Sequence, residues 1–110
     1  MDILEQFGRT DALLEGHFVL SSGLHSPKYL QCALALRHPA DAAEFGKAIA
    51  EKVRDLMPNF TFDTVASPAI GGLVIGFAVA RSLSVPFIWT ERQNGVMTLR
   101  RGFSLSKGER

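Results

Sequence analysis

The stretch between residues 62 and 89 constrains the fold of this chain more than any other. A short apolar run at 62–66 leads into a loop with two adjacent glycines at 67–72, and a mostly apolar segment follows at 73–83. A second short apolar run lies at 86–89. Strand, glycine loop, apolar helix and strand in this order are typical of a parallel βαβ unit. The chain is therefore predicted to be α/β, with a helix at 73–83 that is buried on both sides because it is apolar nearly all round.

Apolar spacing predicts two more helices on the amino-terminal side of this unit. Residues 39–56 carry apolar side chains at three- and four-residue intervals, with Pro39 in the first turn and Pro58 beyond the end. This pattern predicts an amphipathic helix. A first helix is expected at 2–15, where Gly16 would end it.

Short apolar runs predict strands at 17–20 and 29–36. Near the other end, Gln93-Asn94-Gly95 is a hairpin-turn signal, and residues 90–92 and 96–101 would be its two arms. No repeat, low-complexity tract or long linker interrupts these elements, so no internal domain boundary is predicted.

Composition narrows the class of protein. The 110 residues are 46% apolar and 21% charged, which is the profile of a soluble globular domain. A net charge of +1 argues against nucleic acid as a partner, and no apolar run approaches the roughly 18 residues of a membrane span. The acidic amino terminus lacks the basic flank of a signal peptide. A single cysteine, Cys32, excludes an internal disulfide, so a reducing, cytoplasmic setting is expected.

The residues that commonly bind transition metals show no recognisable motif. His17, His25 and His38 lack metal-ligand spacing, and Cys32 has no cysteine neighbour. No zinc site is therefore expected. Cys32 lies in an apolar run and is predicted to be a buried, inert thiol.

The loop at 67–72 has two possible interpretations. A helix that starts directly after a strand presents unpaired backbone N–H groups, and these favour an anion such as phosphate. Gly71 and Gly72 would let a ligand approach the backbone closely. The alternative is a tight turn without a ligand, because two glycines alone are a weak signal.

Two other polar regions leave the same choice open. The loop at 21–27 is rich in hydroxyl groups that can donate to a polar ligand, or it is an ordinary connection. Tyr29 could stack on a planar base or belong to the core. Arg92, Arg100 and Arg101 would lie together on the hairpin, where they could bind phosphate or merely keep an edge strand soluble.

Taken together, three segments resemble the bacterial orotate phosphoribosyltransferases. They are 16–29 (GHFVLSSGLHSPKY), 66–76 (ASPAIGGLVIG) and 91–103 (ERQNGVMTLRRGF). The resemblance implies a type I phosphoribosyltransferase fold, which is a parallel sheet flanked by helices with a small N-terminal hood. It also implies transfer of ribose 5-phosphate from phosphoribosyl pyrophosphate to orotate, giving orotidine 5′-monophosphate in pyrimidine biosynthesis. The family uses Mg²⁺ and acts as a homodimer.

The resemblance also implies roles for individual residues. Three of them match the hood loop beside the orotate pocket, namely Ser21, Ser22 and Gly23, and Tyr29 matches an aromatic position over the orotate ring. The pyrophosphate loop is matched by Ala69, Ile70, Gly71 and Gly72. The catalytic arginines that reach into the neighbouring subunit are matched by Arg92, Arg100 and Arg101. Some members carry lysine where Ser21 and Gly71 stand, so backbone amides are expected to act there.

One family motif has no counterpart in these 110 residues. It consists of an apolar strand, two acidic residues and a loop rich in threonine and glycine, and it binds the ribose phosphate. The chain is therefore expected to be the front portion of one phosphoribosyltransferase domain, with a hood at about 1–38 and the start of the core at about 39–110. By itself it is expected to be inactive.

Two alternative functions use the same scaffold. One is a regulator that senses phosphoribosyl pyrophosphate, although no helix-turn-helix pattern or basic stripe appears in residues 1–41. The other is a phosphoribosyltransferase specific for a purine.

Overall fold

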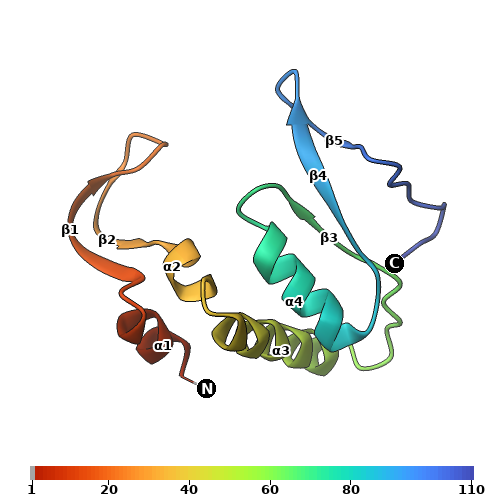
Figure 1. Ribbon diagram of the computed structural model, residues 1–110, viewed down its shortest axis with the longest axis horizontal. Coiled ribbons are helices and arrows are strands. Elements are labelled where there is room, and N and C mark those ends of the chain that lie inside the picture. The colour runs from red at the N-terminus through yellow and green to blue at the C-terminus, as the bar shows by residue number, and fades with distance from the viewer. Residues whose placement is uncertain (1) are drawn as a thin grey trace. The chain divides into compact units, whose positions relative to one another are not determined.

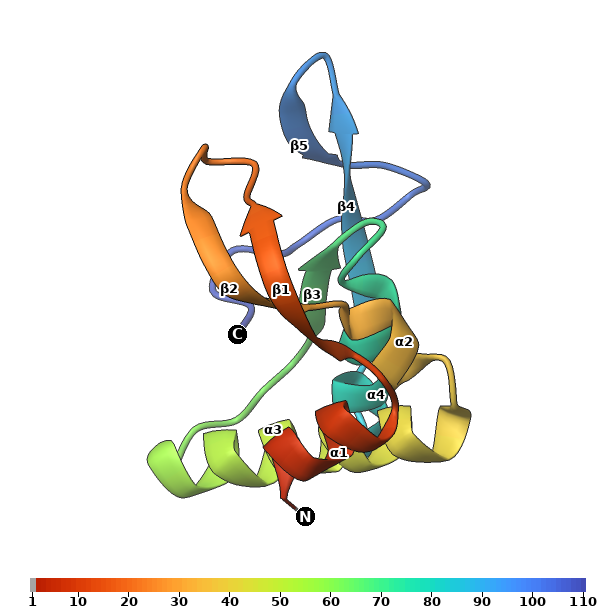
Figure 2. The same ribbon diagram turned by 90° about the vertical axis from the view of Figure 1, so that its left-hand side faces the viewer.

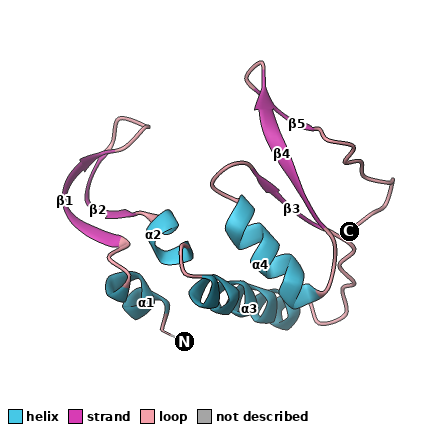
Figure 3. Ribbon diagram, in the orientation of Figure 1, coloured by secondary structure: helices cyan, strands magenta, loops and turns pink. Residues whose placement is uncertain are grey.

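The computed structural model describes residues 2–110, which divide into two units, Met1–Asp41 and Ala42–Arg110. Both units contain helices and strands (Figure 1; Figure 3). The predicted α/β class is therefore confirmed. None of the helices in residues 2–110 combines the length and apolar character needed to cross a bilayer.

The first unit begins with helix α1, Ile3–Arg9, which is shorter than the predicted 2–15. The Asp2 side chain caps it by accepting from the Glu5 amide at 3.1 Å. The helix ends because the backbone turns at Asp11, where φ is +60°. The expected helical residues beyond this point belong to strand β1, Leu13–Val19.

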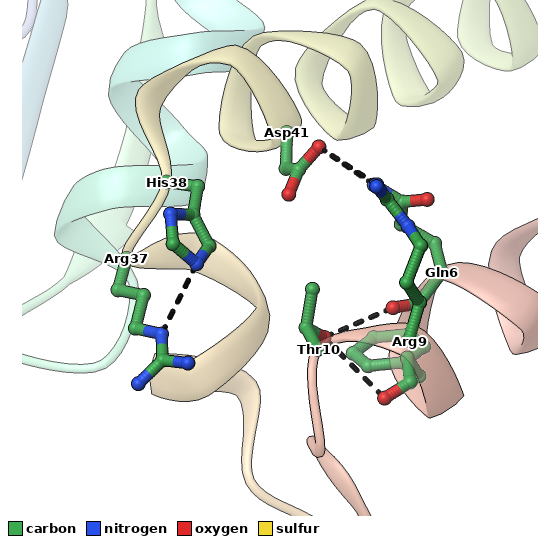
Figure 4. Close-up of polar contacts among 7 residues, drawn as sticks. Gln6, Arg9, Thr10, Arg37, His38 and Asp41 are labelled. Carbon is green, nitrogen blue, oxygen red and sulfur yellow. Dashed lines mark hydrogen bonds and ion pairs between the residues drawn. The ribbon is translucent and has the colours of Figure 1, made fainter.

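Polar contacts tie α1 to the start of helix α3, Pro39–Leu56 (Figure 4). Gln6 Nε2 donates to Asp41 Oδ1 at 2.6 Å, and Arg9 Nη2 lies 3.3 Å from the same oxygen. Thr10 is buried, and its hydroxyl donates to the carbonyl of Gln6 at 2.9 Å. These contacts hold the amino-terminal helix within its own unit, since Asp41 is the last residue of that unit.

Strand β1 pairs antiparallel with β2, His25–Leu30. The ladder is irregular, because Gly16 and His17 bulge opposite Pro27, which has no amide hydrogen to donate. The register changes between Glu15 and Phe18. The hairpin therefore carries one extra residue on β1.

The strand predicted at 29–36 is wrong over most of its length. Strand β2 ends at Leu30, the Gln31 amide donates to Ala12 at 2.7 Å, and Cys32–Leu36 forms the short helix α2. The sequence Cys-Ala-Leu-Ala-Leu contains strong helix formers, which explains this outcome. Cys32 is exposed at the start of α2, so the expected buried thiol is also wrong.

Helices α3 and α4 form the helical layer of the second unit. The predicted helix at 39–56 is confirmed as α3, and the one at 73–83 as α4, Leu73–Leu83. The two helices approach so closely that a Cβ atom at Gly46 would lie 2.5 Å from the backbone carbon of Ala78. Small side chains thus permit the contact between the helices.

The expectation that α4 is buried on both sides is wrong, because one side of the helix is not covered by any of residues 2–110. Gly76 and three neighbouring residues, Ala78, Val79 and Ala80, are buried, but Val74 is 50% exposed and Phe77 63%. One side of α4 packs on the sheet and on α3, and the other keeps an apolar surface.

The sheet of the second unit has the order β3-β4-β5. Strand β3, Val65–Pro68, runs parallel to β4, Phe87–Gln93, and β4 runs antiparallel to β5, Val96–Leu99. The predicted βαβ unit is confirmed, although β3 lies two to three residues later than the expected 62–66. The parallel register from Val65↔Phe87 to Pro68↔Thr90 sets these limits.

The predicted hairpin at Gln93-Asn94-Gly95 is confirmed. Asn94 and Gly95 both have positive φ, +51° and +78°, as a two-residue type I′ turn requires. Figures 1 and 2 both show the β4–β5 turn extending beyond the carboxyl end of β3 and the start of α4.

Candidate functional site

The junction between β3 and α4 uses some of its backbone N–H groups and leaves others free. The Ala69 amide donates to Thr90 at 2.8 Å, the Gly72 amide to Pro68 at 2.9 Å, and the Leu73 amide to Ile70 at 3.1 Å. The amides of Ile70 and Gly71 donate to no acceptor among residues 2–110. These two donors therefore remain available to a ligand, next to the positive end of the α4 dipole.

The free amides lie at an open surface. Ile70 is 84% exposed, and nothing lies within 4 Å of the position that a Cβ atom of Gly71 would take. The peptide bond between Ala69 and Ile70 is cis. An anion could approach this part of the backbone without displacing any side chain of the junction.

The two adjacent glycines have different surroundings. A Cβ atom at Gly72 would lie 2.7 Å from the carbonyl oxygen of Pro68 and 2.9 Å from Cβ of Ser67. The Ser67 hydroxyl donates to the Gly72 carbonyl at 2.6 Å and holds this turn closed. Only glycine fits at position 72, whereas position 71 has room for a side chain.

The three predicted arginines lie on the β4–β5 hairpin or just after it, and their partners differ. Arg101 makes two bonds of 2.9 Å to Glu91, through Nε and Nη2. Arg92 Nη1 donates to the Gly95 carbonyl at 3.0 Å. Arg100 follows the end of β5 and is exposed. Of the three, Arg101 is the one whose charge is balanced by a carboxylate.

The Glu91–Arg101 pair shifts the ionisation of both groups. The hydrogen bond from Arg101 lowers the pKa of Glu91, and the positive charges of Arg101 and Arg100 act in the same direction. Glu91 in turn raises the pKa of Arg101. Sequence analysis missed the role of Glu91. The predicted hairpin places Glu91 opposite Thr98, and Thr98 precedes Arg101 by three residues, so the contact could have been inferred.

The remaining predicted residues lie in the first unit. The turn with Ser21, Ser22 and Gly23 joins β1 to β2, and Gly23 has φ +86°. Its amide donates to Leu20 at 2.8 Å, while Ser22 Oγ accepts from Leu24 at 3.3 Å. The serine hydroxyls are exposed and can donate to a ligand.

Tyr29 is 41% exposed on β2 and is therefore not a core residue. Its ring centroid lies 5.8 Å from that of Phe18, with a tilt of 35°. Part of the ring packs within the hairpin, and part remains available for stacking.

The donors in residues 2–110 do not form a protein-made magnesium site. Magnesium prefers carboxylate and phosphate oxygens. The junction from Ser67 to Gly72 contains no carboxylate, and Glu91 is bound to Arg101. Among the described residues, no group of three or more histidine, cysteine or acidic side chains is placed to hold a metal.

Sequence spacing also missed a histidine pair. His17 Nε2 lies 2.6 Å from His25 Nδ1. The two residues are eight apart in the sequence, which is no known ligand spacing. They meet only because β1 and β2 pair around the bulge.

The sequence is related to proteins of known name along its whole length. No family model matches it. It is 50% identical over 110 residues to a protein named orotate phosphoribosyltransferase from Wolinella succinogenes. The aligned region covers 100% of this chain and 53% of that protein. The chain thus spans about half the length of the curated relatives it matches.

Solved structures support the same fold. Orotate phosphoribosyltransferase from Aeropyrum pernix superposes with a TM-score of 0.68 at 22% identity, over 86% of this chain and 55% of that one. Adenine phosphoribosyltransferase from Trypanosoma brucei, in complex with AMP, pyrophosphate and ribose-5-phosphate, gives a TM-score of 0.56 at 14% identity. The superposed region covers 92% of this chain and 50% of the adenine phosphoribosyltransferase chain.

At these low identities the solved structures establish the type I phosphoribosyltransferase fold alone, whereas the curated relative shares half of its aligned residues with this chain. The resemblance of the three segments at 16–29, 66–76 and 91–103 is thereby confirmed. The chain belongs to the orotate phosphoribosyltransferase family, of which it represents about half a member's length.

Proposed function

We propose that this chain supplies the pyrophosphate-binding junction and the base-facing hairpin of an enzyme that transfers ribose 5-phosphate from phosphoribosyl pyrophosphate to orotate. The observation that carries this proposal is the 50% identity to an orotate phosphoribosyltransferase over all 110 residues. The free amides of Ile70 and Gly71 support it, because they suit the diphosphate that leaves in this reaction.

In the proposed reaction, a nitrogen of the base forms a bond to the ribose carbon while the bond from that carbon to the diphosphate oxygen breaks. Negative charge develops on the departing diphosphate. Ile70 and Gly71 would donate their amide hydrogens to it, and the start of α4 would add its dipole. Because these donors are already oriented by the turn at Gly72, little reorganisation is needed when the charge appears.

The hood residues would recognise the base. The hydroxyls of Ser21 and Ser22, in the turn that Gly23 permits, would bind the polar edge of orotate, and the exposed part of the Tyr29 ring would stack on its face. Orotate carries a carboxylate, so hydrogen-bond donors at this turn match its chemistry.

The arginines would act on the phosphate groups of a second subunit in a homodimer. Arg92, Arg100 and Arg101 offer forked donors that suit phosphate oxygens. Arg101 would first have to exchange its bonds to Glu91 for bonds to the substrate. Arg100, which has no carboxylate ligand of its own in the hairpin, would provide long-range attraction without such an exchange.

The magnesium of the family is part of this proposal, but no step is assigned to it, because residues 2–110 offer no carboxylate set for it. When bound, such an ion would neutralise charge on the diphosphate. A cytoplasmic location is proposed from the single, unpaired cysteine.

The adjacent glycines provide a test of the junction. Gly72→Ala is expected to weaken pyrophosphate binding by at least tenfold, because the new Cβ would collide with Pro68 and distort the turn that orients the free amides. Gly71→Ala is the matched control and should bind nearly as well, since its Cβ would enter open space. Binding is measured from amide chemical shifts at Ile70 and Gly71, with circular dichroism to compare folding. Equal affinity in both variants would contradict the assigned role of the junction.

Base specificity requires the product of the complete gene. Steady-state turnover should be measured with orotate and with adenine, because an adenine enzyme also has this fold. Orotate is expected to be the preferred base. Turnover with adenine but not with orotate would replace the proposal with the purine alternative.

A further inference from the structure

The β1–β2 hairpin carries a pair of imidazole rings that the proposed reaction does not use. His17 and His25 are both exposed, their ring centroids lie 4.9 Å apart, and the rings are inclined by 56°. At 2.6 Å, His17 Nε2 and His25 Nδ1 are within hydrogen-bond distance, and one of the two nitrogens donates to the other. Each of these two nitrogens is therefore directed at the other.

The local backbone explains why the rings converge. His25 is paired with Val19, so it is a diagonal neighbour of His17 across the ladder. The bulge at Gly16 and His17, opposite Pro27, re-aims the His17 side chain, as bulges commonly do. The convergence is thus built into the hairpin and does not depend on the second unit.

We propose that His17 and His25 form a two-histidine site for a borderline-soft divalent metal ion of the zinc, nickel and copper class. The ion would replace the hydrogen bond between the rings and bind Nε2 of His17 and Nδ1 of His25. Neutral imidazole is a preferred ligand for these metals, whereas Mg²⁺ prefers oxygen.

The geometry needs only a small adjustment. Zinc–nitrogen bonds of about 2.0–2.1 Å place two nitrogens of a tetrahedral site about 3.3 Å apart. The present separation of 2.6 Å must therefore widen by about 0.7 Å. Two exposed side chains can make this change by rotating about their own bonds, without moving the strands.

The surroundings leave room for the other ligands of the ion. A hollow of about 280 Å³ is lined by Gly16, His17, His25, Ser26 and Pro27. The Ser26 hydroxyl donates to the Lys28 carbonyl at 2.7 Å, so it is already engaged. Water would complete the coordination. With two protein ligands in place of the four of a structural zinc site, the ion would exchange readily and be removed by a chelator.

Metal binding would have a mechanical consequence for the turn. The two histidines enclose residues 18–24, which include Ser21, Ser22 and Gly23. A bridge across the strands would close this short loop and reduce the freedom of the turn. The amides of residues 18–24 should then exchange more slowly with solvent.

The test is a titration of the 110-residue chain with Zn²⁺ at neutral pH. We expect one ion per chain, and an affinity that falls more than tenfold in both His17→Gln and His25→Gln, because losing a direct ligand costs at least as much as losing a supporting contact. His38→Gln is the matched control, since the His38 ring is bonded to Arg37 and lies outside the pair (Figure 4). Its affinity should be unchanged.

A spectroscopic probe identifies the ligands directly. Cu²⁺ added to the wild-type chain should show electron–nuclear coupling to two imidazole nitrogens. In His17→Gln or in His25→Gln the number of coupled imidazole nitrogens should fall to one. Both variants change exposed residues, and circular dichroism checks that they fold. Binding that survives in His17→Gln, or that is lost equally in His38→Gln, overturns the site, as does a wild-type chain without bound Zn²⁺. Because neither histidine belongs to the proposed catalytic groups, these outcomes are independent of orotate turnover.

Discussion

The two hairpins of this chain differ in what determines their geometry. The β4–β5 hairpin has an uninterrupted register, an Asn94-Gly95 turn and a bidentate Glu91–Arg101 ion pair at its base. The β1–β2 hairpin has a bulge, a proline opposite the bulge and a turn around Gly23. The first is specified by local turn chemistry, and the second by pairing between strands.

This difference in geometry is consistent with the functional role proposed for each hairpin. The regular one would present charged side chains to another subunit, which requires a stiff arm. The irregular one would present hydroxyls and an aromatic ring to a base, and its bulge re-aims side chains near the turn. Substitutions in the two hairpins should therefore have different consequences.

The largest effect is expected from Arg101→Ala in the proposed full-length transferase. Loss of a donor to developing phosphate charge should lower turnover about a hundredfold, which corresponds to about 2.7 kcal/mol. Stability should change much less, because the hairpin is exposed. Arg9→Ala, which removes a surface arginine of the first unit, is the control for turnover. An unchanged rate with a lower melting temperature would show that Arg101 acts only through Glu91.

Gly95→Val should be the most destabilising of the hairpin substitutions. A β-branched residue at φ +78° is strained, and the free energy of unfolding should fall by about 1–3 kcal/mol. Asn94→Gly at the neighbouring position should have a much smaller effect, because glycine adopts φ +51° freely. Denaturant titrations measure both. Equal losses would mean that the turn does not control the β4–β5 hairpin.

The Glu91–Arg101 pair should make the stability of the β4–β5 hairpin depend on pH. The pKa of Glu91 is lowered in the folded chain, so the pair stabilises the fold above the ordinary carboxyl pKa of 4.5. That stabilisation is lost as the pH falls through the lowered folded-state pKa. The difference in melting temperature between wild type and Glu91→Gln should therefore shrink in acid.

Glu15→Gln on the β1–β2 hairpin is the control for this pH dependence. Glu15 faces Lys28 across the ladder, with no ion pair between them in residues 2–110. A difference for Glu91→Gln that stayed constant down to strongly acidic pH would show that the ion pair does not stabilise the hairpin.

The smallest effect is expected from Pro27→Ala. The variant should lose about 0.5 kcal/mol, because its unfolded chain is less restricted. The bulge should persist, since pairing on both sides of it, from Leu13↔Leu30 to Val19↔His25, holds the register. Contacts between strand protons measured by NMR would report this. A regular ladder in the variant would show that Pro27 alone imposes the bulge.

Local chemistry was enough to predict several elements. The helices at 39–56 and 73–83 follow from apolar spacing and flanking prolines, and the β4–β5 turn follows from Asn-Gly. These signals act over a few residues, so neighbouring structure cannot easily override them. The same holds for the glycine junction between a strand and a helix.

Long-range pairing decided the rest, which the residues alone could not show. Cys32–Leu36 is as apolar as a strand, yet β1 pairs only as far as Leu30, and the Ala-Leu sequence becomes α2. The ion pair of Glu91 with Arg101 and the contact of His17 with His25 both join different strands. Register places such residues together, and register is a property of the paired strands and not of either one.

The sequence by itself determined the family, the α/β class, the principal helices and the residue types available for binding a diphosphate. Only the tertiary structure decided which donors are free, Ile70 and Gly71, and which charge is already balanced, Arg101. The reason is physical. A residue type sets what a group can bind, but whether it is available depends on partners that folding brings from elsewhere in the chain.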